Sequence, residues 1–146
     1  MAKVYVSSVI AAPVATVWRT VRDFNGLANW TPFVAKSSIE GNKPSDQVGC
    51  VRDFTLKDGG RIRERLLAFS DHEMSCTYSI LESPMGVENY VATLSLTPVT
   101  DGDLTFAQWT AEFDAETPQR EAELVSHIGQ NVFQGAFSAL KQKLAG

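Results

Sequence analysis

The feature that most constrains the fold is a helical pattern of apolar residues in the last part of the sequence. From about Pro118 to Leu144, apolar residues recur at the three- and four-residue spacing of one helix face. The stripe consists of Leu124, Ile128, Val132 and Ala136, and it is broadened by Val125, Phe133, Phe137 and Leu140. A helix of this length measures ~40 Å, against ~30 Å for a long strand. We therefore expect a sheet that wraps around this helix, with Thr117 as its N-cap.

The rest of the chain has the pattern of strands and turns. Between Phe33 and Asp114, turn residues recur every ~8–12 residues, which is typical of an antiparallel meander of five or six strands. Asp58-Gly59 is the clearest hairpin turn, because glycine accepts the positive φ of a tight turn. The elements expected before the meander are a strand at Lys3–Ile10 and short helices at Val14–Arg22 and Leu27–Trp30. The sequence thus predicts an α+β domain in which a curved sheet grips the terminal helix.

Composition and charge indicate the class of protein. The 146 residues are 44% hydrophobic and 21% charged, which predicts one globular domain over residues 1–146. The net charge of −4 disfavours nucleic acid as a partner. The sequence has no leader-like start and no apolar run of the ~20 residues that span a bilayer, so we expect a cytoplasmic protein without stable membrane insertion. Cys50 and Cys76 lack metal-site spacing, and no metal is expected.

A strongly curved sheet cannot contact a straight helix everywhere, and the space left between them predicts a cavity. Strand alternation indicates which side chains face it. The inner sets are Cys50, Arg52, Phe54 and Leu56; Ile62, Glu64 and Leu66; Met74, Cys76, Tyr78 and Ile80; and Tyr90, Ala92, Leu94 and Leu96, with Trp109 on the last strand. Most of these residues are apolar, so the polar members are the informative ones.

Arg52 and Glu64 place one charge on the apolar face of each arm of the Asp58-Gly59 hairpin. A lone buried charge costs several kcal/mol, so each residue needs a partner: the other residue, water or a ligand. A structural ion pair or a side chain that extends to solvent explains them without any function, and the register that would decide whether they pair stays open. Together with Tyr78 and Tyr90, however, the two charges favour an amphipathic ligand pocket over a dry core.

The order of residues resembles the polyketide cyclase/dehydrase branch of the START-like superfamily, also called SRPBCC. The motifs that carry the resemblance are Ala12-Pro13, Val17-Trp18, Asp23-Phe24, Trp30-Thr31-Pro32, Gly49, Arg52, Gly60, Glu64-Arg65-Leu66, Asp71, Tyr78, Pro84, Asn89-Tyr90, Trp109 and Phe113. The resemblance implies a helix-grip fold, as in birch-pollen allergens: a curved seven-stranded antiparallel sheet, two short helices after the first strand, and a hydrophobic ligand between sheet and terminal helix.

Plant abscisic-acid receptors share this superfamily, and their strand motif is similar to Glu64-Arg65-Leu66. Their ligand-binding lysine corresponds to Ala35, and their gate loop to Lys57–Arg61, which lacks the proline. Their latch falls near Met85-Gly86-Val87. We therefore do not expect hormone sensing by that gate mechanism.

The expected function is binding of a hydrophobic small molecule, lipid-, polyketide- or aromatic-like, with a polar or acidic group. The expected ligand-binding residues are Arg52, Phe54, Leu56, Ile62, Glu64, Tyr78, Ile80, Val87, Tyr90, Ala92, Trp109, Val125, Ile128 and Val132. One alternative is a cofactor-independent polyketide cyclase or dehydratase of the aromatase type, with Glu64, Arg52 and Tyr78 as catalytic candidates. Another is a protein-interaction module with a collapsed cavity. No cofactor is expected, and we expect a monomer or homodimer.

Overall fold

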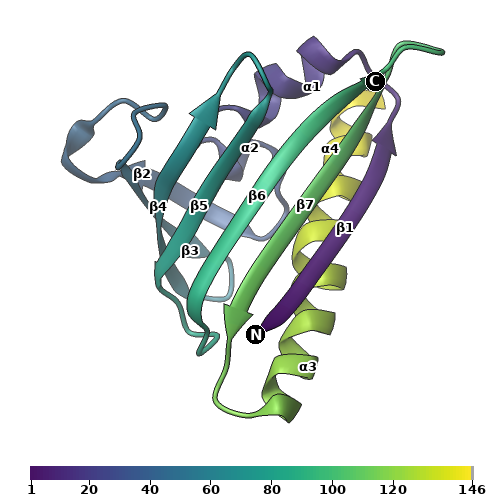
Figure 1. Cartoon of the computed structure of the whole chain (residues 1–146). Coiled ribbons are helices and arrows are strands. Elements are labelled where there is room, and N and C mark those ends of the chain that lie inside the picture. The colour runs from purple at the N-terminus through teal and green to yellow at the C-terminus, as the bar shows by residue number, and fades with distance from the viewer. Residues whose placement is uncertain (146) are drawn as a thin grey trace.

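The computed structural model describes residues 1–145 and consists of a single sheet with a long helix across its inner face (Figure 1). Seven antiparallel strands follow the order β1-β7-β6-β5-β4-β3-β2. Their bounds are β1 Ala2–Ile10, β2 Val34–Ile39, β3 Val51–Leu56, β4 Arg61–Ser70, β5 Ser75–Glu82, β6 Glu88–Val99 and β7 Leu104–Asp114. The predicted α+β helix-grip architecture with a seven-stranded sheet is confirmed.

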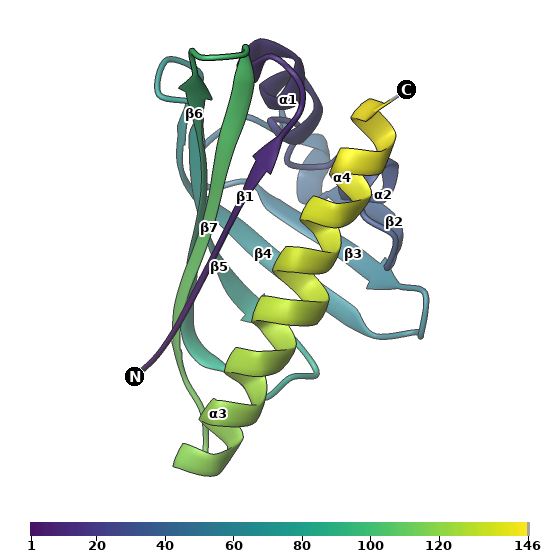
Figure 2. The same ribbon diagram turned by 90° about the vertical axis from the view of Figure 1, so that its right-hand side faces the viewer.

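Short helices connect the two edge strands of the sheet. α1 (Val14–Val21) and α2 (Leu27–Trp30) lie between β1 and β2, as expected, and a 3-10 turn, η1 (Glu40–Asn42), follows β2. α1 buries Val17, Trp18 and Val21 on one face. Figure 2 shows that α1 and α2 lie beside the C-terminal part of the long helix.

The terminal helix is continuous from Pro118 to Ala145 but changes its winding in the middle. α3 (Pro118–Ser126) and α4 (Gly135–Ala145) flank a π-helical segment, η2 (His127–Gln134). Thr117 is the N-cap, as predicted, and its Oγ1 accepts a hydrogen bond of 3.0 Å from the Arg120 amide. A π turn takes five residues instead of four, so the buried stripe steps from Ile128 to Phe133.

That step places Phe133 against the sheet. The Phe133 ring stacks on Trp109 of β7 with ring centroids 4.3 Å apart and an interplanar angle of 8°. Val132, which the sequence placed on the main stripe, is half-buried instead. The stripe that contacts the core is therefore Leu124, Ile128, Phe133, Ala136, Phe137 and Leu140.

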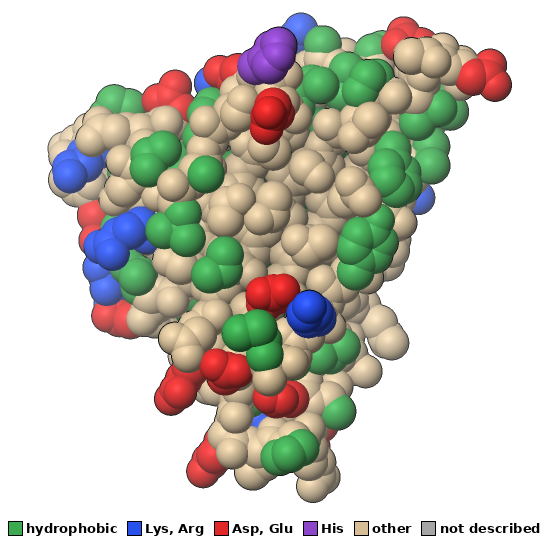
Figure 3. Space-filling model, viewed as in Figure 1, with side chains coloured by type: hydrophobic (Ala, Val, Ile, Leu, Met, Phe, Trp, Pro, Cys, Tyr) green, Lys and Arg blue, Asp and Glu red, His purple; other side chains and the backbone are tan. Residues whose placement is uncertain are grey.

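Strand alternation is as predicted on the inner face. Cys50, Leu66, Cys76, Leu94 and Leu96 are buried in the core, while Met74 is half-buried in the turn before β5. The outer face is rich in hydroxyl groups, such as Thr77 and Thr93, whose side chains lie 2.8 Å apart. Figure 3 views this face, where charged side chains gather mostly at the edges and the lower end. No helix among residues 1–145 is long and apolar enough to cross a membrane.

Candidate functional site

A cavity of about 690 Å³ lies between the inner face of the sheet and the terminal helix. Strands β3 to β7 and the terminal helix supply most of its wall, and α2 and the neighbouring loops supply the rest. The expected ligand-binding residues that line it are Arg52, Phe54, Leu56, Ile62, Glu64, Tyr78, Ile80, Tyr90, Trp109, Ile128 and Val132. The cavity expected between the curved sheet and the straight helix is therefore present. Most of the side chains that strand alternation placed on the inner face of the sheet line it.

Three expected ligand-binding residues lie outside the cavity wall. Ala92 is buried beside Tyr78, its partner in β5, and the larger Tyr78 forms that part of the wall. Val125 follows Leu124 on the helix, and a rotation of ~100° per residue turns it away from the cavity that Leu124 lines. Val87 is half-buried in the β5–β6 loop, where Met85 reaches the wall instead.

The wall also contains residues that the sequence did not predict. They are Leu27, Thr31 and Phe33 around α2; Lys57 and Asp58 in the β3–β4 turn; Pro84 and Met85 in the β5–β6 loop; and Arg120, Leu124, His127, Asn131 and Phe133 on the helix. Periodicity assigns faces to helices and strands but gives a loop no position in space. His127 is exposed and borders the cavity.

Arg52 and Glu64 form an ion pair on the inner wall. They are direct partners in the β3–β4 register, and each is only 5% exposed. Arg52 Nε and Nη2 lie 2.8 and 2.6 Å from the same oxygen, Glu64 Oε1. Burial raises the pKa of the Glu64 carboxyl, and the adjacent Arg52 opposes that rise. The register left open by the sequence thus brings the two charges together.

The guanidinium of Arg52 has further partners. Its Nη1 donates to the Phe24 carbonyl at 3.0 Å, and its Cζ lies 3.9 Å from the Phe24 ring centroid and 4.7 Å from that of Tyr78. Arg52 is therefore engaged by a carboxylate, a carbonyl and two aromatic rings, which is enough to hold a buried cation without a ligand.

Two tyrosines and a tryptophan continue this polar cluster, which comprises Arg52, Glu64, Tyr78, Tyr90 and Trp109. Trp109 Nε1 donates to the Tyr78 hydroxyl at 3.1 Å. Burial raises the pKa of both Tyr78 and Tyr90, so both hydroxyl groups stay protonated at neutral pH. The cluster can donate and accept hydrogen bonds at the inner end of an otherwise apolar cavity.

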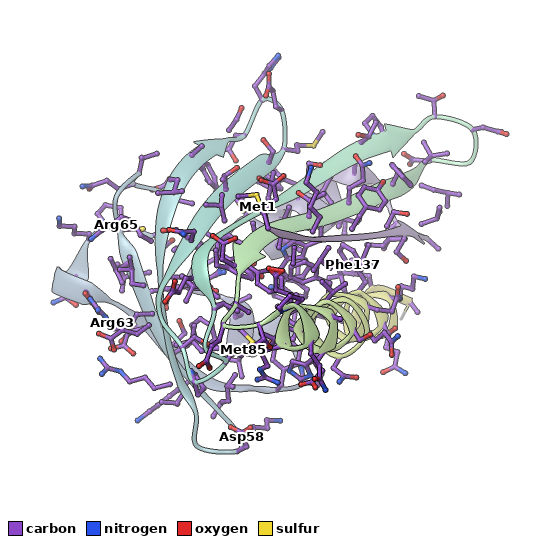
Figure 4. The ribbon with its side chains drawn as sticks, turned by 60° about the horizontal axis from the view of Figure 1, so that its bottom comes forward. Met1, Asp58, Arg63, Arg65, Met85 and Phe137 are labelled. Carbon is purple, nitrogen blue, oxygen red and sulfur yellow. The ribbon has the colours of Figure 1, made fainter. Side chains whose placement is uncertain are left out.

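The open end of the cavity, which we call the mouth, comprises Lys57, Asp58, Pro84, Met85, Arg120, His127 and Asn131. All of these residues are exposed except Met85, which is half-buried. Figure 4 views the molecule from this end and shows Asp58 at the tip of the β3–β4 turn and Met85 beside the start of the helix. Across residues 1–145, no group of three or more His, Cys, Asp or Glu side chains could hold a metal ion.

The family model for polyketide cyclase/dehydrase and lipid transport matches residues 1–145. The chain belongs to this family. The resemblance expected from the motifs is therefore confirmed, and members of this family bind hydrophobic ligands.

Two curated relatives are abscisic acid receptors from Arabidopsis thaliana. PYL7 is 29% identical over 92 residues, which are 61% of this chain and 42% of the receptor. PYL10 is 29% identical over 113 residues, which are 75% of this chain and 61% of the receptor. The family member described here thus matches less than two thirds of the length of either receptor.

Solved bacterial structures are similar over nearly the whole chain. The protein XoxI from Bacillus cereus has 28% identity and a TM-score of 0.87, covering 99% of this chain and 96% of that chain. A protein from Thermobifida fusca has 31% identity and a TM-score of 0.87, covering 98% of this chain and 93% of that chain.

Proposed function

We propose that this protein binds one hydrophobic small molecule, lipid-, polyketide- or aromatic-like, in the cavity between sheet and helix. The observation that carries the proposal is the cavity itself: about 690 Å³, enclosed by apolar side chains from β3 to β7 and the helix. Small-molecule sites typically measure ~300–1,000 Å³ and combine apolar walls with a few polar groups. A protein-interaction module with a collapsed cavity fits this geometry less well.

Binding without reaction is the simplest role for the polar cluster. Arg52 is engaged by Glu64 and the Phe24 carbonyl, so it has little capacity left to stabilise a developing negative charge. Tyr78 and Tyr90 have pKa values raised by burial, which disfavours proton release to a substrate. The cluster is suited to orienting a polar end of a ligand.

The test uses the apolar fluorophore N-phenylnaphthylamine and two matched helix variants. Val132→Trp places a large side chain in the cavity wall, whereas Val125→Trp makes the same change at a half-buried position outside that wall. We expect one fluorophore per chain, affinity at least about tenfold weaker in Val132→Trp, and little change in Val125→Trp. Equal affinities in the two folded variants would contradict the proposal, as would absence of binding to the unmodified protein.

A cofactor-independent cyclase or dehydratase is the second candidate, and one contact favours it. Arg52 Nε and Nη2 both approach Oε1 of Glu64, and Glu64 Oε2 accepts no hydrogen bond within residues 1–145. Burial raises the pKa of this carboxyl, which makes it better suited to general acid–base work than an exposed carboxyl. Turnover of a poly-β-ketone analogue that is lost in Glu64→Gln, while N-phenylnaphthylamine still binds, would establish catalysis. Unchanged turnover in Glu64→Gln would exclude this role for Glu64.

A further inference from the structure

The inner end of the cavity is poorly suited to an anion. The Arg52 cation is neutralised by Glu64, whose carboxylate lies 2.6 Å from its guanidinium. A second carboxylate placed at this end would meet the Glu64 charge in a low-dielectric environment, where like charges repel strongly. The donors and acceptors of Tyr78 and Tyr90 instead suit an uncharged polar group. The sequence left a ligand as one of the partners that Arg52 could have, and the ion pair with Glu64 makes an acidic ligand group unfavourable at this position.

The mouth has the opposite character. The Lys57 amide donates to the Phe33 carbonyl at 3.0 Å, which fixes the backbone of Lys57 at the edge of the cavity. Its ammonium group makes no ion pair or hydrogen bond with any residue of the described range 1–145, and the exposed residue Lys57 lines the cavity. An exposed lysine with no protein partner beside an apolar wall is suited to the charged end of an amphipathic ligand.

The helix side of the mouth supplies further donors. Arg120 Nη2 donates to the Met85 carbonyl at 3.3 Å, and its Nη1 lies 3.2 Å from Glu123. Further along the same helix, in η2, Asn131 Nδ2 lies 3.0 Å from His127 Nδ1. The amide nitrogen can only donate, so the proton of a neutral His127 ring lies on Nε2 and remains available to a ligand.

The charged groups at the mouth differ in whether they have a partner within the protein. The chain carries a net charge of −4, and the mouth holds Lys57, Arg120 and one carboxylate, that of Asp58, while Arg120 is paired with Glu123 at 3.2 Å. Asp58 Oδ1 accepts a hydrogen bond of 2.9 Å from the Gly60 amide, so this carboxylate is engaged within its own turn. Because Arg120 is paired with Glu123 and Asp58 is engaged in its own turn, Lys57 is the mouth cation without an ion-pair partner in the described residues, and its charge favours an anionic partner at this position.

We infer that the ligand is an amphipathic acid, whose carboxylate-like head group binds at the mouth to Lys57, with donors from Arg120 and His127, while its uncharged end lies at the polar cluster. This inference rests on the proposed binding function and adds the chemical class and the orientation of the ligand. It predicts that affinity for an anionic ligand depends on a residue at the exposed rim.

The test compares two probes that share one ring skeleton: neutral N-phenylnaphthylamine and anilinonaphthalenesulfonate, which adds an anionic group. Their dissociation constants are measured for the unmodified protein, for Lys57→Gln, and for Lys141→Gln. The last is a control that removes the same charge from an exposed helix position outside the cavity wall. We expect Lys57→Gln to weaken sulfonate binding about three- to tenfold more than binding of the neutral probe, the range for a partly exposed charge-assisted contact.

The outcomes separate this inference from the function on which it rests. If the neutral probe binds but the ratio of the two affinities is the same in Lys57→Gln and Lys141→Gln, the mouth does not hold the anion and the inference fails alone. If neither probe binds, or if Val132→Trp binds both probes as tightly as the unmodified protein does, the cavity is not the binding site. In that case the proposed function and this inference both fail. A loss of sulfonate affinity confined to Lys57→Gln, and reduced by high salt, supports the inference.

Discussion

Arg52 of β3 and Glu64 of β4 lie directly opposite each other and form a buried ion pair on the cavity wall, with 2.6 Å between Nη2 and Oε1. Taking two charges out of water costs several kcal/mol per ion, and their mutual attraction offsets this only while both are present. The pair therefore links the stability of the β3–β4 hairpin to the polarity of the cavity.

Removing one partner of this pair should destabilise the fold more than removing both. We expect Arg52→Met to lower the free energy of unfolding by about 3–5 kcal/mol, because Glu64 is left as an uncompensated buried charge. The double variant Arg52→Met/Glu64→Leu should recover most of that loss, since no charge remains. Urea denaturation of the single and double variants measures both values. A single variant as stable as the double one would show that the pair does not act as a unit.

Trp30 and Trp18 offer a comparison between an unpaired and a paired indole. Both are buried, but Trp30 Nε1 has no hydrogen-bond partner in the described part of the chain, whereas Trp18 Nε1 donates to Asp71 at 2.7 Å. Replacement by Phe removes an unsatisfied donor at Trp30 and a charge-assisted hydrogen bond at Trp18. We expect Trp30→Phe to cost at least about 1 kcal/mol less stability than Trp18→Phe in urea denaturation. Equal losses would indicate that Trp30 Nε1 is satisfied in solution.

Burial of Tyr90 should make stability fall at alkaline pH. Its pKa in the folded protein is raised above the ordinary value of 10.0, because burial penalises the phenolate. The unfolded chain loses this proton at pH ~10 while the folded protein retains it, so the contribution to stability is full below pH ~10 and declines as the pH rises further. We expect Tyr90→Phe to reduce the slope of unfolding free energy against pH above that point. Parallel curves for Tyr90→Phe and the unmodified protein would contradict the raised pKa.

Phe133 should contribute strongly to the contact between helix and sheet. It is fully buried in η2 and stacks on Trp109 at 4.3 Å. Phe133→Ala should cost about 3–5 kcal/mol in urea denaturation, the usual range for truncating a buried aromatic residue. Val132→Ala, one residue earlier and half-buried, should cost clearly less. The reverse order would mean that the helix keeps a regular four-residue spacing through this segment.

The sequence was sufficient for the elements and for most of the cavity wall, because both depend on local periodicity. Alternation placed Arg52 and Glu64 on the inner face without structural information, and Thr117 identified the start of the helix. The pairing of the two charges depends on the register between β3 and β4, which neither strand encodes by itself. The register between β4 and β5 is likewise shifted by bulges near Glu64 and Leu66. That information arises only when the strands meet.

The errors have equally specific causes. A regular helix through residues 118 to 144 places Val132 on the main stripe, whereas the π turn gives that position to Phe133. Lys57 and Met85 belong to loops whose residues have no period, so their approach to the same opening depends on the curvature of the whole sheet. The mouth, where the inferred anion site lies, was therefore the part least accessible to sequence reasoning.

The most direct test of the central claim, that a hydrophobic ligand occupies the cavity, is a methyl NMR titration with N-phenylnaphthylamine. The chain has five isoleucines, at positions 10, 39, 62, 80 and 128. Ile62, Ile80 and Ile128 line the cavity, while Ile10 and Ile39 lie outside its wall. We predict saturable shift changes and contacts to the ligand protons at the three cavity methyl groups, with the other two unchanged. No change at the cavity methyl groups, or changes confined to Ile10 and Ile39, would contradict the proposed function.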